Sequence, residues 1–216
     1  MSLAGRLVPG IARVRAQAGP FADAWQAANA AALTETGPLW VALGDSMSQG
    51  LGAHDISGGW VSQLHAALAA DGRPLRLVNL SVTGARISDV LSSQLPRLAD
   101  LSAGPALVTV LAGANDMLRR SRRPAAVRDY AALLDRLPAG RTVVATLPRR
   151  NAAALAVNAL IDGAAAAGRI QVAEMRGMTV RAMLSTRGED LFHPGERGYA
   201  MIATAFRDAI HQLPAA

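Results

Sequence analysis

The feature that most restricts the fold is an alternation, from residue 38 onward, of short apolar runs with longer stretches of helical periodicity. The apolar runs have the length and continuity of strands that are buried on both faces, as in a parallel sheet. The stretches between them repeat apolar residues every three or four positions, as amphipathic helices do. This alternation predicts βα units joined by right-handed crossovers, and therefore an α/β fold whose mostly parallel sheet is covered by helices on both faces.

The ends of these elements follow from glycine, proline and the limits of each apolar run. Residues 176–184 are expected to form a short helix or an irregular segment. Strands are expected over residues 39–43, 75–80, 106–112, 142–146 and 170–173. Helices are expected over residues 60–70, 87–101, 125–137, 152–167 and 195–213, the second of them kinked or restarted at Pro96.

Residues 1–36 precede this alternation and are expected to form a helical appendage, with the main domain over residues 37–216. Gly19 and Pro20 should divide the appendage into two helices, with Pro20 opening the second. The favoured interpretation is that its apolar stripe packs on the flank of the main domain. The alternative is docking on a membrane surface or a partner, because arginines lie on the other side. The stripe consists of Leu7, Ile11, Val14, Ala18, Phe21, Trp25 and Ala28, and the arginines are Arg6, Arg13 and Arg15.

The chain contains no cysteine, which excludes disulfides, a thiolate nucleophile and cysteine-ligated metal sites. This absence fits a reducing compartment. No run reaches the roughly 18 uninterrupted apolar residues that a membrane span needs. Residues 1–10 lack the apolar core of a secretory signal. A cytoplasmic location is therefore expected.

All cationic side chains other than histidine are arginines, and the net charge is +6. The arginines are scattered, and aromatic residues make up only 4% of the chain, too few for the stacking platforms of proteins that bind single-stranded nucleic acid. Nucleic acid is therefore not an expected partner. For the densest basic cluster, a solvated loop is the favoured interpretation, and attraction of an anionic part of a substrate is the alternative. The cluster comprises Arg119, Arg120, Arg122 and Arg123.

A serine follows the first predicted strand on a glycine-rich turn, where residues 44–50 read GDSMSQG. Open α/β sheets build their sites at the carboxyl ends of their strands. Ser46 is therefore a candidate nucleophile that needs a base, a group to orient that base, and donors for an oxyanion. The alternative is that Asp45 and Ser46 only cap the following helix or turn.

Three further segments, residues 79–86, 113–116 and 190–194, are expected at the same edge of the sheet. His193 lies in a loop, from which its ring can reach out as a base. Asp190 lies three residues earlier and can accept the hydrogen of one ring nitrogen, which leaves the other nitrogen to take the serine proton. The alternative for this pair is an ordinary helix-capping turn.

Cleavage of an ester also needs hydrogen-bond donors aimed at the developing oxyanion. The backbone amides of Ser46 and Gly84 and the side-chain amide of Asn115 are the candidate donors. Glycine at position 84 permits close approach of an acyl group. The alternatives are a plain turn at Gly84 and an Asx-turn or helix cap at Asn115 and Asp116.

The four segments together resemble blocks I, II, III and V of the SGNH (GDSL-type) hydrolase family. They occur in the order of that family, and the resemblance covers residues 40–210, so that residues 1–36 lie outside it. Met47 stands where the family name implies leucine. The matching motifs are the Gly-Asp-Ser of residues 44–46, the glycine block at Gly84, the Gly-x-Asn-Asp of residues 113–116 and the Asp-x-x-His-Pro of residues 190–194.

The resemblance implies a flavodoxin-like three-layer α/β/α sandwich, with a five-stranded parallel sheet in the order 2-1-3-4-5 and with no metal or cofactor. It implies that Ser46 is the nucleophile, that His193 is the general acid and base, and that Asp190 orients it. The oxyanion hole it implies is formed by Ser46, Gly84 and Asn115, with Asp45 and Asp116 supporting the turns.

The predicted function is that of a serine hydrolase that cleaves carboxylic esters of small acyl groups through an acyl-enzyme. Short loops at residues 54–59, 117–124, 147–152 and 185–189 suggest an open, shallow site. Acetyl or other short esters and lysophospholipid-like substrates are therefore expected. The alternatives are an acyltransferase or thioesterase with the same triad, and a flavodoxin-like binding module without chemistry. The candidate rim residues are Met47, Met117, Arg119 and Phe192.

Overall fold

The computed structural model of the chain describes residues 3–101, 104–148, 151–178, 186 and 188–213. Its parallel strands form one sheet in the order β2-β1-β3-β4-β5, which confirms the predicted flavodoxin-like arrangement. Each predicted strand is present, with its ends shifted by at most one residue. The strands are β1 (Leu39–Gly44), β2 (Arg76–Asn79), β3 (Leu107–Leu111), β4 (Thr142–Ala145) and β5 (Gln171–Ala173).

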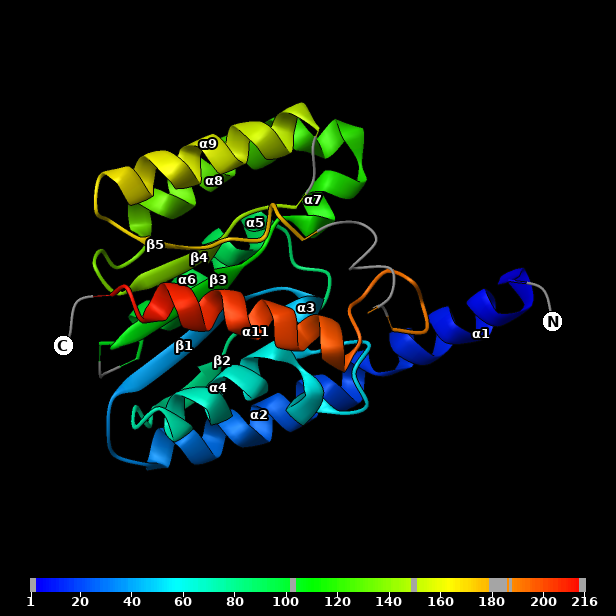
Figure 1. Ribbon diagram of the computed structural model, residues 1–216, viewed down its shortest axis with the longest axis horizontal. Helices are drawn as coiled ribbons and strands as arrows, with labels where there is room; N and C mark the ends of the chain where they lie inside the picture. The colour runs from blue at the N-terminus through cyan, green and yellow to red at the C-terminus, as the bar shows by residue number, and fades with distance from the viewer. Residues whose placement is uncertain (1–2, 102–103, 149–150, 179–185, 187, 214–216) are drawn as a thin grey trace.

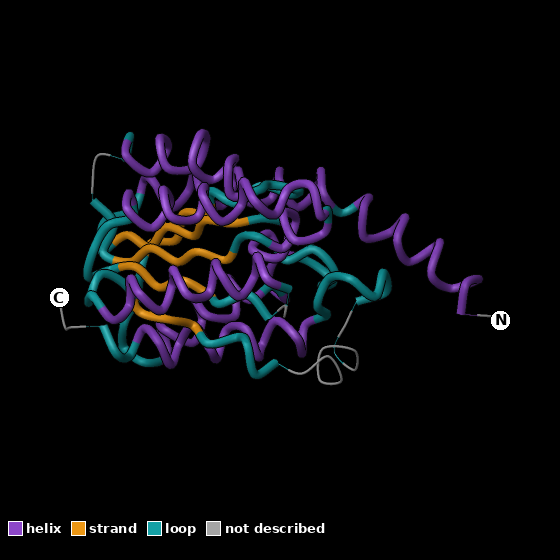
Figure 2. Tube along the Cα trace, turned by 90° about the horizontal axis from the view of Figure 1, so that it is seen from above, coloured by secondary structure: helices purple, strands orange, loops and turns teal. Residues whose placement is uncertain are grey.

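The sheet is the middle of three layers (Figure 1), and the view from above shows its strands between two groups of helices (Figure 2). Successive strand residues point to opposite faces, so a central strand needs apolar residues throughout. In β1, Val41 and Leu43 join one core cluster, and Trp40 and Ala42 join the other. The first face is covered by α8 (Arg123–Arg136) and α9 (Ala152–Ala166), and the second by α4 (Trp60–Ala70) and α11 (Glu196–Ile210).

The helix expected over residues 87–101 is interrupted before the predicted kink at Pro96. It consists of α5 (Ile87–Asp89), a π-helical segment (Val90–Gln94) and α6 (Leu95–Ala99). Pro96 has no N–H to donate to a carbonyl one turn earlier, and the widened turn ahead of it accommodates the missing bond. Single π-helical turns inside α-helices often lie at functional sites.

The N-terminal segment forms two helices, α1 (Leu3–Ala16) and α2 (Ala18–Thr34). The break between them lies at Gln17, ahead of the predicted break at Gly19 and Pro20. Pro20 falls in the first turn of α2, where backbone N–H groups have no partner within the helix, so a residue without an N–H is tolerated.

The second helix runs along the edge strand β2, whereas α1 projects from the body of the molecule (Figures 1 and 2). The Asn29 side chain accepts a hydrogen bond from the Asn79 amide at 2.7 Å and donates one to the Asn79 carbonyl at 2.8 Å. Trp25 is buried, and its indole donates to the carbonyl of Gln49 at 3.0 Å. Side chains of α2 thus satisfy backbone groups at the open edge of the sheet, where unpaired strands are prone to association.

The remaining differences concern short helical turns, the last helix and one segment. The helix expected over residues 195–213 ends at Ile210. The turns α3 (Ser46–Gln49) and α7 (Ala114–Leu118) were not predicted as helices, and α8 begins two residues earlier than expected. Residues 176–178 form a turn, and the rest of the segment expected at 176–184 lies outside the described residues. Within the described residues, no helix has the length and apolar character that crossing a bilayer requires. The domain boundary after residue 36 stays a prediction.

Candidate active site

Ser46 lies at the carboxyl end of β1, as the first residue of the short helix α3. The backbone at Gly44 passes so close to the end of β3 and to α3 that a Cβ there would collide with both, which explains a glycine at this point. Asp45 caps α3, because its Oδ1 accepts a hydrogen bond from the Met47 amide at 3.0 Å. The capping interpretation therefore holds for Asp45. The Ser46 hydroxyl lies instead beside the His193 ring.

Three side chains form a continuous hydrogen-bonded chain that starts at Ser46. Its Oγ lies 2.8 Å from Nε2 of His193, and Nδ1 of His193 lies 2.6 Å from Oδ2 of Asp190. The side chains of His193 and Asp190 are 12% and 8% exposed. An ionised carboxylate can only accept hydrogen bonds, so His193 carries its proton on Nδ1 and its Nε2 can accept the proton of the Ser46 hydroxyl.

The turn that carries Asp190 and His193 is fixed from within. Oδ1 of Asp190 accepts hydrogen bonds from the amides of Phe192 and His193, both at 2.9 Å, and the Gly188 amide donates to the His193 carbonyl at 2.8 Å. Leu191 has φ of 58°, the one positive value at a non-glycine residue in the described part of the chain. That conformation costs about 1–2 kcal/mol, which the bonds to Asp190 help to offset.

The same contacts act on the charge of Asp190. Burial raises the pKa of this carboxyl group, but hydrogen bonds from the His193 ring and from the amides of Phe192 and His193 outweigh that effect. The pKa of Asp190 therefore lies below its usual value, and the group is ionised at neutral pH.

Candidate hydrogen-bond donors for an oxyanion also lie close to Ser46. In the described part of the chain, the backbone amides of Ser46 and Gly84 have no hydrogen-bond acceptor. Nδ2 of Asn115 donates to the carbonyl of Ala85 at 2.9 Å and makes a long contact of 3.4 Å with Oδ2 of Asp45. The three donors predicted for an oxyanion hole are thus gathered beside the predicted nucleophile.

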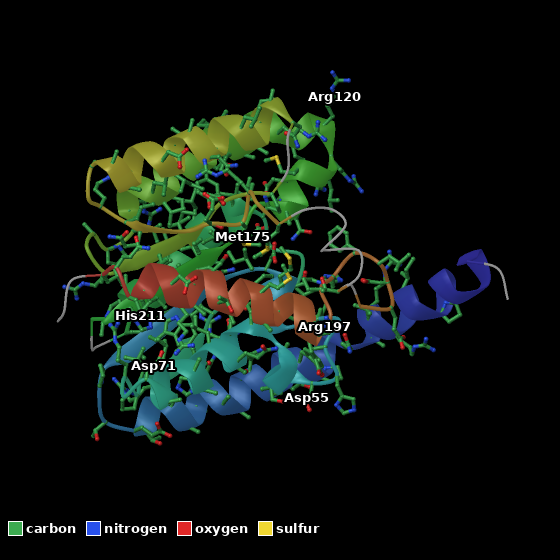
Figure 3. The ribbon with its side chains drawn as sticks, viewed as in Figure 1. Asp55, Asp71, Arg120, Met175, Arg197 and His211 are labelled. Carbon is green, nitrogen blue, oxygen red and sulfur yellow. The ribbon has the colours of Figure 1, made fainter. Side chains whose placement is uncertain are left out.

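Two hollows lie near Ser46, the first lined by Ser46 itself and the second by its neighbour Met47. The first, which we call the Ser46 groove, has a volume of about 180 Å³ and is lined by Ser46, Gly84, Asn115 and His193 together with residues of α1 and α2. The second, which we call the methionine cavity, has a volume of about 100 Å³. Phe192 lines both hollows, and Figure 3 shows Met175 between α11 and the layer of α8 and α9. The methionines of the cavity are Met47, Met117, Met175, Met178 and Met201.

The predicted rim residues fall into two groups. Met47, Met117 and Phe192 line the methionine cavity, whereas Arg119 lines neither hollow. The other arginines of its cluster line neither hollow, and Arg123 donates instead to the Met117 carbonyl at 3.0 Å. Of the loops expected at the rim, residues 54–59 contribute no lining residue. Among the described residues, no group of three or more His, Asp or Glu side chains could hold a metal ion.

The sequence matches the GDSL-like Lipase/Acylhydrolase family over residues 42–201. That span contains the Ser46 turn, the donors at Gly84 and Asn115, and the turn with His193. The chain belongs to this family. The prediction of an SGNH (GDSL-type) hydrolase is therefore confirmed at the level of the family, and α1 and α2 precede the part of the chain that the family shares.

Individual relatives of this GDSL-family chain match it over a short stretch or at low sequence identity. Esterase TesA of Pseudomonas aeruginosa is 44% identical over 79 residues, which make up 36% of this chain and only 37% of TesA. A crystal structure of TesA has a TM-score of 0.68 at 23% identity, covering 82% of this chain and 99% of that one. The SGNH-hydrolase family esterase AlinE4 has a TM-score of 0.62 at 21% identity, covering 84% and 100%. At such identities, these structures show a shared fold.

The GDSL-family site also depends on three buried amide side chains that the sequence analysis missed. Gln94 donates to the Gly44 carbonyl at 2.8 Å and accepts from the Gly44 amide at 2.9 Å. Gln49 accepts from the Thr83 amide at 3.0 Å, and Asn79 donates to the Ser48 carbonyl at 2.8 Å. These bonds fix the Ser46 turn and tie it to the loop that carries Gly84.

One of these residues left a signal in the sequence. Gln94 follows Val90 by four residues and Ile87 by seven, so it occupies a core position of a helical pattern. A polar side chain at such a position has to find a partner, because burying an amide without one is costly. For Gln49 and Asn79 we find no comparable signal.

Two buried carboxyl groups, Asp45 and Asp116, accept hydrogen bonds from backbone amides of the turns around the GDSL-family site. Oδ2 of Asp116 accepts a hydrogen bond from the Ile87 amide at 3.2 Å. Burial raises the pKa of both groups. The pKa of Asp45 is raised to about 7. Burial raises this pKa most and the nearby charge of Asp116 adds to the increase, while the hydrogen bond from Met47 partly opposes it.

The raised pKa of Asp45 predicts that Asp45→Asn stabilises the protein more at high pH than at low pH. The folded state binds a proton between the ordinary pKa of 3.8 and about 7, so the parent loses stability as the pH rises through this window. Asparagine cannot ionise and keeps an oxygen for the Met47 amide. We expect the free energy of unfolding of the variant, relative to the parent, to gain about 3 kcal/mol from pH 5 to pH 8.

Urea unfolding at several pH values measures this difference. The exposed Asp208 provides the control, since Asp208→Asn should give a curve parallel to that of the parent. A constant difference between Asp45→Asn and the parent at all pH values would contradict the raised pKa.

Proposed function

We propose that the protein is a serine hydrolase that cleaves carboxylic esters of short acyl groups through an acyl-enzyme. The observation that carries the proposal is the chain from Ser46 through His193 to Asp190, which lies beside two backbone amides without acceptors. A binding module has no need of such a chain, whereas nucleophilic catalysis by serine requires a base and a group that orients it.

Acylation begins with attack of Ser46 Oγ on the ester carbonyl carbon. The Oγ–H proton passes to Nε2 of His193, which is 2.8 Å away. The imidazolium that forms is stabilised by the Asp190 carboxylate on Nδ1. When the tetrahedral intermediate collapses, the bond to the alcohol oxygen breaks and His193 donates the proton to that oxygen.

The oxyanion of the tetrahedral intermediate is proposed to accept hydrogen bonds from the amides of Ser46 and Gly84 and from Asn115. The amide of Asn115 can exchange its 3.4 Å contact with Asp45 for the oxyanion, because that contact is too long to be a strong hydrogen bond. Loss of one such donor typically lowers turnover by about 10²- to 10³-fold.

Deacylation uses the same groups in reverse. His193 takes a proton from a water molecule, whose oxygen attacks the carbonyl carbon of the acyl-enzyme. The second intermediate collapses, the bond to Ser46 Oγ breaks, and His193 returns the proton to Ser46. The free acid leaves, and the hydrogen bond between Ser46 and His193 is restored.

The methionine cavity supports the assignment of short acyl groups. Its lining is mostly apolar and includes Met47, the neighbour of Ser46, and Phe192, which also lines the Ser46 groove. Its volume of about 100 Å³ is small beside the roughly 300–1,000 Å³ of pockets that enclose drug-sized ligands. Methionine side chains adapt to ligands of irregular shape, so we propose this cavity as the place of the acyl chain.

A series of p-nitrophenyl esters from acetate to dodecanoate tests the proposed function. We expect hydrolysis of acetate and butyrate and a fall in kcat/KM of about tenfold or more towards dodecanoate, because longer chains do not fit the cavity. Release of p-nitrophenol is followed by absorbance. Absence of turnover with every ester would contradict the proposed function, and equal rates for all chain lengths would contradict only the proposed acyl preference.

A further inference from the structure

The N-terminal helices form one wall of the Ser46 groove. Val14 and Arg15 of α1 and Ala18 of α2 line the groove together with Ser46 and His193. All three precede residue 42, where the match to the family begins. This wall is therefore a feature of the present chain that the shared part of the family does not supply.

The wall is anchored to the loop that carries His193. Gly10 of α1 lies against the carbonyl of Glu189, where a Cβ would collide with it. Nε of Arg13 donates to Oε2 of Glu189 at 2.5 Å. An exposed pair of this kind adds little stability, but it lies next to Asp190 and sets the position of α1 relative to the turn.

A second anchor lies at the junction of the two helices. The Gln17 side chain accepts a hydrogen bond from the Gly52 amide at 2.9 Å and donates one to the Ala53 carbonyl at 2.8 Å. Gly52 in turn packs directly against His193. Val14 is buried against Leu51. The position of Arg15 beside the groove is thus defined by packing and hydrogen bonds on both sides of it.

Arg15 is the charged residue among the three that form this wall, and its charge has no partner in the described structure. The side chain is exposed and has no hydrogen bond or ion pair with any described residue. Among the described residues, no acidic side chain lines the groove, and the carboxylate of Glu189 is already paired with Arg13. A guanidinium presents a planar set of donors that matches carboxylate and phosphate oxygens.

We infer that Arg15 binds an anionic group on the alcohol portion of the ester, so that the enzyme prefers esters of anionic alcohols. The inference rests on the proposed function. The methionine cavity, proposed for the acyl chain, has no lining residue from α1. The alcohol portion therefore extends into the Ser46 groove, where Arg15 can reach a carboxylate or a phosphate.

Three butyrate esters of para-substituted phenols test the inference, with a carboxylate, a phosphate monoester or a neutral carboxamide as the substituent. We expect Arg15→Gln to lower kcat/KM for the two anionic esters by about tenfold, mainly through KM, because one charged hydrogen-bonding partner is lost. Hydrolysis of the neutral ester should change less than about twofold. Arg15→Lys keeps the charge and should restore part of the preference. The ratio of the two anionic esters shows which anion Arg15 favours.

Arg120→Gln is the matched control, because it removes the same charge elsewhere. Arg120 is exposed and lies at the outer end of the α7 and α8 layer, well away from α1 (Figure 3). It should leave the preference for anionic esters unchanged. Raising the salt concentration should reduce this preference in the parent and not in Arg15→Gln, since salt screens exposed charges.

Several results would overturn the inference. Equal losses on anionic and neutral esters in Arg15→Gln would indicate a structural role, and an equal loss in Arg120→Gln would indicate a general effect of net charge. Equal kcat/KM of the parent for the neutral and the anionic esters would show that it has no preference for anionic alcohols. In each of these cases, the neutral ester provides a separate test of the proposed function. If the parent hydrolyses this ester and Ser46→Ala does not, the proposed function is still supported. Failure to hydrolyse any ester would reject both.

Discussion

Replacing Ser46 with alanine is expected to lower the turnover of p-nitrophenyl acetate by at least about 10⁴-fold, while the protein stays folded. The hydroxyl is the proposed nucleophile, and its Oγ is the atom that lies 2.8 Å from the His193 ring. Alanine keeps the backbone amide of the oxyanion hole and the cap formed by Asp45, so the loss should fall on kcat. Single-turnover and steady-state rates measure it, and reaction of Ser46 with a fluorophosphonate should disappear in the variant.

A second serine in the same short helix provides the control. The Ser48 hydroxyl is buried and has no hydrogen-bond partner in the described structure, so Ser48→Ala should change turnover only a few-fold at most. Both variants should unfold at temperatures close to that of the parent. Turnover near the parent level in Ser46→Ala, after the protein is shown to be free of contaminating esterase, would contradict the proposed nucleophile.

Asp190→Asn should lower kcat by about 10³- to 10⁴-fold without removing the side chain. Its oxygen can still accept hydrogen bonds from the amides of Phe192 and His193, so the turn should persist. In the parent, Nδ1 of His193 lies 2.6 Å from the carboxylate oxygen Oδ2 of Asp190. The amide nitrogen that replaces this oxygen cannot accept a hydrogen bond from the Nδ1 proton. The ring is then driven to the tautomer with its proton on Nε2, and that nitrogen can no longer take the proton of Ser46.

The pH dependence of kcat separates this effect from a general loss of structure. In the parent, the Asp190 carboxylate stabilises the imidazolium that forms on His193 during the reaction. Because Asp190→Asn removes that stabilisation at every pH at which the parent is active, kcat should be lowered throughout this pH range. The exposed Asp208 is the control, and Asp208→Asn should retain parent rates. A decrease in kcat of less than about tenfold in Asp190→Asn would contradict the role of Asp190.

The chemistry of the site could be predicted from the sequence because each part of it is local. Gly44 lies two residues before Ser46, Asp190 lies three residues before His193, and Gly84 acts within its own turn, so each motif spans only a few residues. Backbone conformation over such distances depends mainly on the residues themselves. The strand order was implied by family resemblance, and the alternation of apolar runs with helical stretches gave independent support for a parallel sheet.

The sequence was less informative where a side chain depends on a partner far along the chain. Gln94, the last residue of the π-helical segment, binds the Gly44 backbone from fifty positions away along the chain. The break at Gln17 differs from the predicted one because proline in the first turn of a helix does not end it. Arg119 was a candidate rim residue, yet it lines neither hollow, whereas Arg15 of the appendage lines the Ser46 groove.

The sequence by itself determined the succession of strands and helices along the chain, the family, and the residue types that could act as nucleophile, base and orienting acid. Only the tertiary structure decided that Ser46 and His193, 147 positions apart, lie within hydrogen-bond distance, and that α1 closes one side of the groove. The physical reason is that periodicity and turn chemistry are encoded by neighbouring residues. The approach of distant side chains depends on how the layers pack, which no single segment of the chain encodes.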